Sequence, residues 1–507
     1  MRKLDTPQAT ADVSAGADLT LLPSHRDLFY GGAWHAPLSG RYFELTSPGT
    51  GEALGKAADG ADADVDAAVA SAHQAFPAWR DTPPLERAKA LRRFAEIVRD
   101  NTRELAMLDA IDCGNPVRAM LGDAEIAAAQ IDFFAGLVTE MKGASIPMGS
   151  DRMNVSVREP LGVVARIIPF NHPFMFAAGK SAAPLAAGNT IVVKPPEQAP
   201  LSALRLAELV ADVFPPGVFN VVTGQGRETG AALVVHPHVA KVALIGSVAA
   251  GRAVMRSASD TLKPVLLELG GKNALIAFAD ADPATVADAM IAGMNFAWCG
   301  QSCGSTSRVF LHGTIHDAVL NELKARIGAF RPGRPHMWET TMGAISSRAQ
   351  YDRVLGYIAS ATKEGATLVC GGSSPQASEL AGGLFVDPTV FADVTPAMTI
   401  AREEIFGPVL SVLKWTDEAA MMRDVNAVEM GLTCSIWTND LNAALRTASA
   451  AQAGYVWVNE VGRHFLGAPF GGIKQSGVGR EECLEELLSF TQEKNIHLRF
   501  APRPPRT

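Results

Sequence analysis

Cysteine is scarce in this sequence, with six residues among 507. The six are Cys113, Cys299, Cys303, Cys370, Cys434 and Cys483. A small secreted scaffold held by disulfides would need a much higher density. The closest pair, Cys299 and Cys303, has no second Cys or His pair nearby, so we expect no metal site. Reduced thiols in the cytoplasm are the natural interpretation of this usage.

Long apolar runs and long basic runs are also missing. No apolar stretch reaches the ~18 residues needed to span a bilayer, so no membrane segment is expected. The formal net charge of −8, without a basic run, argues against nucleic acid as a partner. The first 27 residues carry Asp5, Asp12 and Asp18 and no continuous apolar segment, unlike a signal or transit peptide. We expect residues 1–25 to form a loose extension.

The composition is that of a globular α/β protein, with 48% hydrophobic and 19% charged residues. A chain of 507 residues is too long for one ordinary core, so two or three domains are expected. Apolar side chains recur at helical spacing over residues 62–76 and 84–100, and Pro84 suits a first helical turn.

From residue 161 the pattern changes to strands that alternate with helices. Apolar, β-branched runs occur at 161–168, 190–193, 218–222, 241–245 and 273–278, with helical segments near 174–187, 200–214, 227–236 and 249–258. This spacing is typical of βαβ units and predicts a parallel, doubly wound sheet. Such sheets bind ligands outside the carboxyl ends of their strands.

Unusual short motifs begin where the predicted strands stop. They are Phe170-Asn171, Lys194-Pro195-Pro196-Glu197, Gly224-Gln225-Gly226 and Gly246-Ser247. We therefore expect the chemistry and a cofactor site along one edge of the sheet.

Three residues could together complete a cycle of oxidation and hydrolysis. A thiolate at Cys303, in Gly300-Gln301-Ser302-Cys303, can attack a carbonyl and form a thioester. Glu268 could activate the water that releases it, and Asn171 could donate to the oxyanion beside the backbone N–H of Cys303. Each has a plainer alternative: a buried small hydrophobe, a paired structural carboxylate, and a turn residue before Pro173.

From about Phe29 to Phe500 the sequence resembles the aldehyde dehydrogenase superfamily. The motifs that carry the resemblance occur in family order: PFNHP (169–173), AAGNTIVVKPPEQAPLSA (186–203), ELGGKNA (268–274), GQSCGSTSR (300–308), FVDPTVF (385–391), EEIFGPVL (403–410), GYVWVN (454–459) and PFGGIKQSGVGRE (469–481). So many ordered matches are highly specific. They imply NAD-dependent oxidation of an aldehyde to a carboxylic acid.

The resemblance assigns roles to the three residues and adds a fourth. It implies Cys303 as nucleophile, Glu268 as general base, Asn171 as oxyanion donor, and Lys180 as a lysine near the active site. Relatives that pass the acyl group to coenzyme A generally lack a carboxylate at the position of Glu268, so release of free acid is favoured. The alternatives are an acylating enzyme and a catalytically inactive binding protein of the same fold.

The cofactor site is expected at the glycine-rich turns. Gly224, Gly226 and Gly230 depart by one residue from the usual dinucleotide fingerprint, and a tight strand-to-helix turn explains them equally well. The resemblance implies that the cofactor contacts Ile168, Pro169, Phe170, Lys194, Glu197, Gly226, Gly230, Gly246, Ser247, Gly251, Leu269, Glu404 and Phe406. Glu197 can accept from free ribose hydroxyls and would repel a 2′-phosphate, which favours NAD over NADP.

Three departures from the family pattern bear on the substrate. Gly179 stands where relatives often carry a large aromatic residue, and it is expected to open the substrate tunnel. His172 stands where they often carry Phe or Tyr, and Trp298 stands where they usually carry Asn. We expect a bulky apolar or aromatic aldehyde rather than betaine aldehyde, since a quaternary ammonium needs several ring faces around it. Candidate wall residues are Phe170, Met175, Phe176, Met294, Trp298, His464, Phe465 and Phe470. His172 and His464 could be pH-sensitive residues at the mouth of the tunnel, but we interpret them as surface residues without a role.

The resemblance implies an α/β fold of three parts. A Rossmann-like NAD-binding domain is expected over 26–140 and 159–269, and an α/β catalytic domain over 270–470. A small β oligomerisation element over 141–158 and 480–500 would pair subunits into a homodimer or homotetramer, because MNVSVREP and QEKNIHLRF have strand character.

Overall fold

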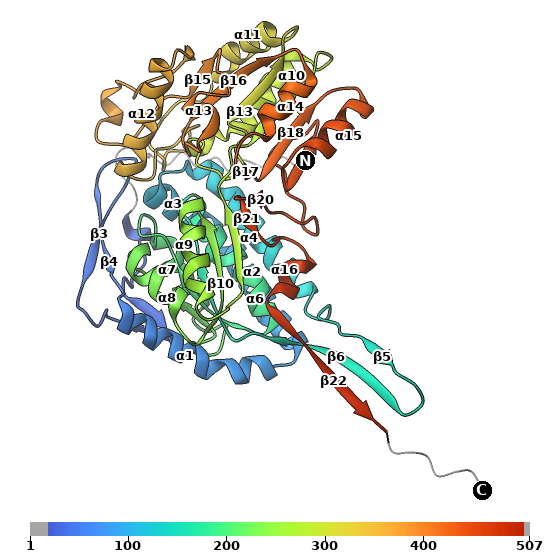
Figure 1. The fold of residues 1–507 in the computed structure, drawn as a ribbon. Coiled ribbons are helices and arrows are strands. Elements are labelled where there is room, and N and C mark those ends of the chain that lie inside the picture. The colour runs from blue at the N-terminus through green and yellow to red at the C-terminus, as the bar shows by residue number, and fades with distance from the viewer. Residues whose placement is uncertain (1–18, 501–507) are drawn as a thin grey trace.

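A computed structural model describes residues 19–500 of the chain. The expected N-terminal extension falls mostly outside this range, apart from a short 3-10 turn, η1 (Leu19–Leu21). Figure 1 shows two large α/β bodies, one built on the N-terminal half and one on residues coloured yellow to orange, with a narrow β arm that extends away from both.

The first sheet has eight strands, of which the five in the middle are parallel. Its order is β2 (Ala33–His35), β1 (Leu28–Tyr30), β9 (Phe219–Val221), β8 (Thr190–Lys194), β7 (Val163–Ile167), β10 (Val239–Gly246), β11 (Val265–Leu269) and β21 (Gly477–Val478). The first four predicted strands are thereby confirmed. Strand β11, which the sequence patterns did not single out, completes the parallel set.

Helices cover both faces of this sheet, because its strands are apolar on both sides. Val164, Val193 and Ala243 pack in a core with helices α2 (Pro84–Asp100) and α4 (Val117–Gly136). Their neighbours Val163 and Val192 pack in a second core with α1 (Asp62–Asp81) and α9 (Val248–Ser259). This alternation confirms a doubly wound sheet. The remaining helices of this body are α3 (Thr102–Cys113), α5 (Pro173–Gly179), α6 (Ala182–Ala187), α7 (Leu201–Val210), a π-helical turn η2 (Gly226–Gly230) and α8 (Ala231–Val235).

The second sheet has seven strands in the order β14 (Thr367–Cys370), β15 (Thr389–Ala392), β16 (Val409–Trp415), β13 (Arg308–His312), β12 (Ala274–Ala277), β18 (Thr433–Trp437) and β19 (Tyr455–Val458). The run at 273–278 was grouped with the first sheet by the strand pattern, although it falls within the expected catalytic domain (270–470). It forms β12 near the middle of this second sheet. The sequence pattern could not show this, because a buried parallel strand looks the same in either sheet. The helical elements here are α10 (Pro283–Met294), η3 (Phe296–Trp298), α11 (His316–Ile327), α12 (Arg348–Lys363), η4 (Ser378–Leu380), α13 (Thr399–Arg402), α14 (Glu418–Asn426) and α15 (Leu441–Ala450).

The projecting arm is a three-stranded antiparallel sheet. Strand β6 (Arg152–Pro160) lies between β5 (Ser145–Pro147) and β22 (Thr491–Arg499), which follows helix α16 (Leu484–Ser489) (Figure 1). The predicted strand character of both segments is confirmed. Two small ribbons complete the fold: β3 (Tyr42–Thr46) with β4 (Ala53–Ala58), and β17 (Met430–Gly431) with β20 (Ile473–Lys474). Among residues 19–500, no helix is both long enough and apolar enough to cross a bilayer.

Candidate active site

A cavity of about 350 Å³ brings Cys303, Glu268, Asn171 and Lys180 together. Asn171 follows β7, Glu268 lies near the carboxyl end of β11, and Cys303 lies in the loop between η3 and β13. Because β7 and β11 flank β10 in parallel, their carboxyl ends meet at one edge of the sheet. The fold therefore places these side chains together at that edge, as expected.

The loop that carries Cys303 is held in place by hydrogen bonds to its backbone and by a tight glycine turn. Asn273 donates through Nδ2 to the carbonyl oxygens of Cys303 at 2.7 Å and Ser305 at 3.0 Å. Gly300 precedes the cysteine with φ of 65°, and a Cβ there would lie 2.4 Å from the carbonyl oxygen of Gly407. Only glycine fits this turn without displacing the chain.

Cys303 and Glu268 line the same cavity, close enough for each to act on the pKa of the other. Burial, and then the charge of Glu481, raises the pKa of Glu268 to about 8. Burial, and then Glu268, raises the pKa of the Cys303 thiol well above its usual value. At neutral pH both the Glu268 carboxyl and the Cys303 thiol therefore hold their protons. Within residues 19–500, the Glu268 Oε1 atom has no hydrogen-bond partner.

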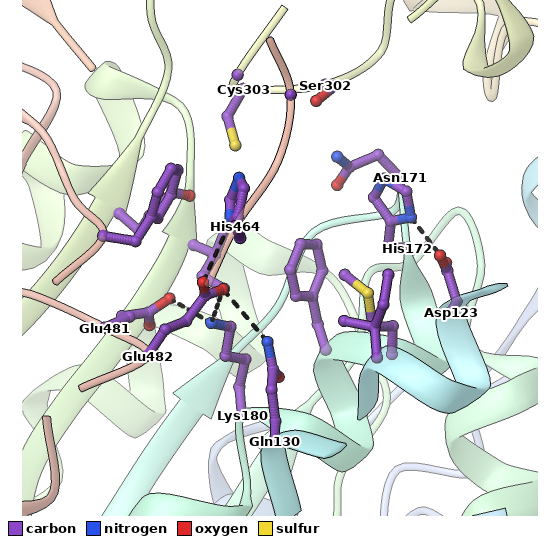
Figure 2. Close-up of a pocket in the computed structure, with 18 of the residues that line it drawn as sticks. Asp123, Gln130, Asn171, His172, Lys180, Ser302, Cys303, His464, Glu481 and Glu482 are labelled. Atoms are coloured by element: carbon purple, nitrogen blue, oxygen red, sulfur yellow. Dashed lines mark hydrogen bonds and ion pairs between the residues drawn. The ribbon is translucent and has the colours of Figure 1, made fainter. Parts of the chain in front are cut away.

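Asn171 lies in a turn held by helix α3. Asn115 donates through Nδ2 to the carbonyl oxygen of Asn171 at 2.6 Å, and Asp109 accepts from the backbone N–H of Phe174 at 3.2 Å. The Asn171 side chain makes no hydrogen bond through Oδ1 within the described chain. Figure 2 shows its amide turned toward the side of the cavity where Ser302 and Cys303 lie.

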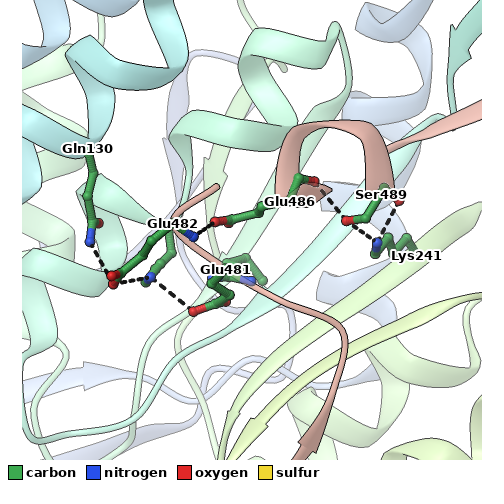
Figure 3. A network of polar contacts seen from close by, with 8 residues as sticks. Gln130, Lys241, Glu481, Glu482, Glu486 and Ser489 are labelled. Atoms are coloured by element: carbon green, nitrogen blue, oxygen red, sulfur yellow. Dashed lines mark hydrogen bonds and ion pairs between the residues drawn. The ribbon is translucent and has the colours of Figure 1, made fainter. Parts of the chain in front are cut away.

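A buried charged cluster forms the floor beneath these residues, and sequence reasoning missed most of it (Figures 2 and 3). Lys180 binds Glu481 at 2.9 Å and Glu482 at 3.2 Å, while Arg166 binds Glu481 at 2.7 Å. Burial acts to lower the pKa of Lys180, but the two carboxylates more than offset it and raise that pKa. Burial acts to raise the pKa of Glu482, but Lys180 and His464 reverse this and lower it to about 2.

The cluster extends away from the cavity toward the arm. Glu486 accepts from the backbone N–H of Glu482 at 2.6 Å, and burial raises the pKa of Glu486 to about 7. In the sequence, the two acids that end GVGREE (477–482) were the signal that could have revealed this charged floor. Asp123 and Gln130 were a second signal, since polar residues seven apart lie on one face of the alanine-rich helix α4.

The four residues predicted for the substrate wall, Phe176, Trp298, His464 and Phe470, all line the cavity, as does Met175. Three other candidates lie elsewhere. Phe170 packs edge-on against Phe406, Met294 is in the core of the second body, and Phe465 is exposed and outside the lining.

Two expectations about this wall are wrong. His172 is buried rather than on the surface, with its Nδ1 atom 2.7 Å from Asp123 Oδ2. Gly179 does not open the cavity, because a Cβ there would lie 2.2 Å from Gln130 Oε1. The side chain of Gln130, from helix α4, occupies the space that the glycine leaves, which a local sequence pattern cannot reveal.

Apart from Glu404 and Phe406, the residues predicted for the cofactor lie at or near the same edge of the first sheet. Lys194, at the end of β8, pairs with Glu197 at 3.0 Å, and Ser247 caps helix α9 by accepting from the N–H of Ala250 at 3.2 Å. The backbone N–H groups of Ile168 and Leu269 donate to Lys194 O at 3.2 Å and Ser476 O at 2.9 Å. Gly251 lets α9 approach Leu269 closely. Pro169 directly follows Ile168.

Glu404 and Phe406 approach the site from the second body. Glu404 accepts from the N–H of Gly271 at 3.1 Å, and burial raises its pKa to about 6. It lies close enough for its charge to raise the pKa of both Glu268 and Cys303. Phe406 meets Phe170 edge-on with ring centroids 5.7 Å apart.

Comparison with known proteins identifies the class. The chain belongs to the aldehyde dehydrogenase family, whose model matches residues 34–496, and it is therefore an oxidoreductase that acts on aldehydes. It is 52% identical over 484 residues to aldehyde dehydrogenase tropH of Talaromyces stipitatus, covering 94% of each chain. It is 42% identical over 457 residues to a betaine aldehyde dehydrogenase of Cereibacter sphaeroides, covering 90% of this chain and 93% of that protein.

A solved structure shares the fold. Indole-3-acetaldehyde dehydrogenase of P. syringae, in complex with NAD+ and IAA, matches with a TM-score of 0.92 and 36% identity over 95% of this chain and 98% of that one. A nicotinamide cofactor, NAD(P), is accordingly part of the enzyme's chemistry.

Proposed function

We propose that this enzyme oxidises an aldehyde to the free carboxylic acid with NAD, through a thioester on Cys303. The observation that carries the proposal is that the Cys303 thiol, the Glu268 carboxyl and the Asn171 amide line one cavity. A nucleophile near a base, beside an amide that can donate, is the arrangement that acyl chemistry on a thiol needs.

The residues act in a fixed order. The Cys303 sulfur adds to the aldehyde carbon, and its proton passes to the ionised form of Glu268. Asn171 Nδ2 and the backbone N–H of Cys303 donate to the oxyanion that forms. Bound NAD supplies the acceptor for the hydride that leaves the same carbon. Glu268 releases the proton it took from Cys303 to bulk water and so returns to its ionised form. It then takes a proton from the water whose oxygen attacks the thioester. The C–S bond breaks, the acid leaves, and the Cys303 thiolate can take its proton back from Glu268.

The floor of the cavity tunes the base. Glu481 stays ionised because Arg166 and Lys180 both bind it. Its negative charge adds to burial in raising the pKa of Glu268. A carboxylate with a raised pKa is a stronger base near neutral pH than an ordinary surface glutamate, which is what water activation requires.

The cofactor residues fit NAD. Gly230 has open space where a Cβ would stand, and a Cβ at Gly226 would meet nothing nearer than Glu197 at 3.8 Å, so a ligand can approach the backbone there. The N-terminus of the 12-residue helix α9 suits a pyrophosphate. Glu404 and Phe406 would hold the nicotinamide end.

Glu197 supports a preference for NAD over NADP. Lys194 outweighs burial and lowers the pKa of Glu197, so the carboxylate is ionised and would repel a 2′-phosphate. Glu197→Gln keeps the side-chain size and removes the charge. The ratio of kcat/KM with NADP to that with NAD is expected to rise about tenfold or more. A ratio that stays at the wild-type value would contradict this role for Glu197.

We propose a bulky apolar or aromatic aldehyde as substrate. Trp298, Phe176 and Phe470 supply aromatic walls. The volume of about 350 Å³ is at the lower end of small-molecule pockets and suits an aldehyde with a single ring. Two of the acids in the lining, Glu481 and Glu482, are paired with Arg166 and Lys180 and offer no free charge to a quaternary ammonium. We therefore expect betaine aldehyde to be a poorer substrate than an aromatic aldehyde, even though betaine aldehyde dehydrogenases are among the relatives.

The acylating alternative makes a different product. If Glu268 activates water, purified enzyme supplied with NAD and benzaldehyde releases benzoate at a rate that coenzyme A does not change. Product analysis with and without coenzyme A distinguishes the two reactions. Benzoyl-coenzyme A as the main product, with turnover that depends on coenzyme A, would replace hydrolysis by acyl transfer.

We also propose that the arm pairs subunits into a homodimer or homotetramer. Strand β22 is at the edge of its sheet and exposes Ile496 and Leu498. An edge strand with exposed apolar side chains is suited to pairing with a second chain. The domain limits given above, with the arm as an oligomerisation element, remain predictions.

A further inference from the structure

Two imidazoles line the cavity, and a buried carboxylate holds each one by the same ring atom. His172 has Nδ1 at 2.7 Å from Asp123 Oδ2, and His464 has Nδ1 at 3.0 Å from Glu482 Oε2 (Figure 2). The proposed oxidation uses neither imidazole. A buried carboxylate is costly unless paired, so these pairs need an explanation beyond packing of an apolar wall.

His172 is the more deeply held of the two. Its side chain is 9% exposed and that of Asp123 is 2% exposed. Trp298 and Phe176 meet the imidazole edge-on, with ring centroids 4.9 Å and 5.7 Å away. The ring can therefore neither flip nor turn without losing its carboxylate partner and both aromatic contacts.

The carboxylate fixes which ring nitrogen carries the proton. A partner that only accepts, such as Asp123, keeps the proton of a neutral imidazole on Nδ1, so Nε2 has a free lone pair. Nε2 is separated from Nδ1 by one ring carbon and makes no hydrogen bond within residues 19–500. Because His172 is part of the cavity lining, a ligand in the cavity lies beside this ring.

We infer that His172 and Asp123 select planar aldehydes with a ring hydroxyl, which donates to His172 Nε2 while the aldehyde carbon meets Cys303. This specificity rests on the proposed oxidation and names its substrate class. Trp298 and Phe176 pack against the aromatic ring of the substrate, and His172 Nε2 accepts a hydrogen bond from the hydroxyl on that ring. A site built to bind a hydroxyl rejects the analogue that lacks one, because its own polar group is then left unpaired.

Pairs of substrates test this inference. Each hydroxybenzaldehyde isomer is compared with the methylbenzaldehyde of the same pattern, because methyl has nearly the size of hydroxyl and cannot donate. At least one hydroxyl isomer is expected to exceed its methyl partner about tenfold or more in kcat/KM. In His172→Phe this ratio is expected to fall to within about threefold of one. Asp123→Asn keeps the shape but can donate to Nδ1, so it should lower the ratio too.

His236→Phe is the matched control. His236 is also buried and pairs with an aspartate, through Nε2 and Asp66 Oδ1 at 3.1 Å, but it is outside the cavity lining. The ratio should stay at the wild-type value in this variant. A wild-type ratio near one for every isomer, or a preference that survives His172→Phe, would overturn the inference.

Binding to the Cys303→Ala variant separates this inference from the proposed function. Calorimetric affinities for the same hydroxyl and methyl pairs, with and without His172→Phe in that background, need no turnover. If no aldehyde yields NADH but the hydroxyl preference in binding depends on His172, the oxidation fails and the recognition stands. If turnover is normal and binding shows no preference, the recognition fails alone.

Discussion

Cys303→Ala is expected to lower NADH formation with any aldehyde by at least about 10⁴-fold, because no other described side chain in the cavity can form the thioester. The substitution removes one half-buried sulfur and leaves the turn at Gly300 and the contacts of Asn273 intact. NAD binding and the melting temperature should therefore stay close to those of the unchanged enzyme. NADH absorbance over time, with calorimetric NAD binding, measures both.

Cys299→Ala provides a control in the same loop. Cys299 is buried, its Sγ donates to the carbonyl oxygen of Gly343 at 3.0 Å, and the residue is outside the cavity lining. Its activity should stay within a few-fold of wild type. Turnover that survives in Cys303→Ala, or is lost equally in Cys299→Ala, would show that the covalent route through Cys303 is wrong.

The parts of this fold that the sequence predicted are those governed by local pattern. Runs of β-branched residues mark β7, β8 and β10, since a strand buried on both faces needs apolar side chains throughout. The residues that follow parallel strands must lie at one sheet edge, so the strand pattern alone places Asn171 and Gly246 together. The Cys303 loop was located by its motif, which local periodicity alone does not explain.

The floor and the wall of the cavity depend on tertiary packing, and here prediction failed. Whether Glu481 or His172 is buried depends on the elements that cover it, which no local window contains. Gly179 is the clearest case. Its missing side chain indicated a wider tunnel, yet Gln130, from a helix some fifty residues earlier in the chain, fills the space.

Charge pairing explains why the missed residues matter. Arg166, inside strand β7, is fully buried and could only be tolerated opposite a carboxylate, which Glu481 supplies from the other end of the chain. The sequence shows an arginine in an apolar strand and two acids after a glycine-rich motif. It does not show that they meet, or that Glu481 then raises the pKa of Glu268.

Glu268→Gln is expected to separate oxidation from hydrolysis. One equivalent of NADH per active site should form in a burst, and steady turnover should then fall by about 10²- to 10⁴-fold, because glutamine cannot take a proton from water. Stopped-flow NADH absorbance resolves the two phases. The burst itself should be slower than in wild type, since the Cys303 thiol loses the group that accepts its proton.

The pH dependence of wild-type turnover supplies an internal check. Because burial and Glu481 raise the pKa of Glu268 to about 8, the base form is in the minority below that pH. Where hydrolysis limits turnover, kcat should rise about tenfold per pH unit up to about pH 8 and level off above it, and Glu268→Gln should lack this rise.

Hydroxylamine tests the nature of the stalled species. It attacks a thioester without help from a base, so it should restore repeated NADH formation in Glu268→Gln and yield the hydroxamate of the acid. Cys303→Ala should not respond, because it forms no thioester to be attacked. If hydroxylamine leaves Glu268→Gln stalled after one equivalent, the acyl group is not held on Cys303 and the step assigned to Glu268 must be placed earlier, in the addition of the thiol.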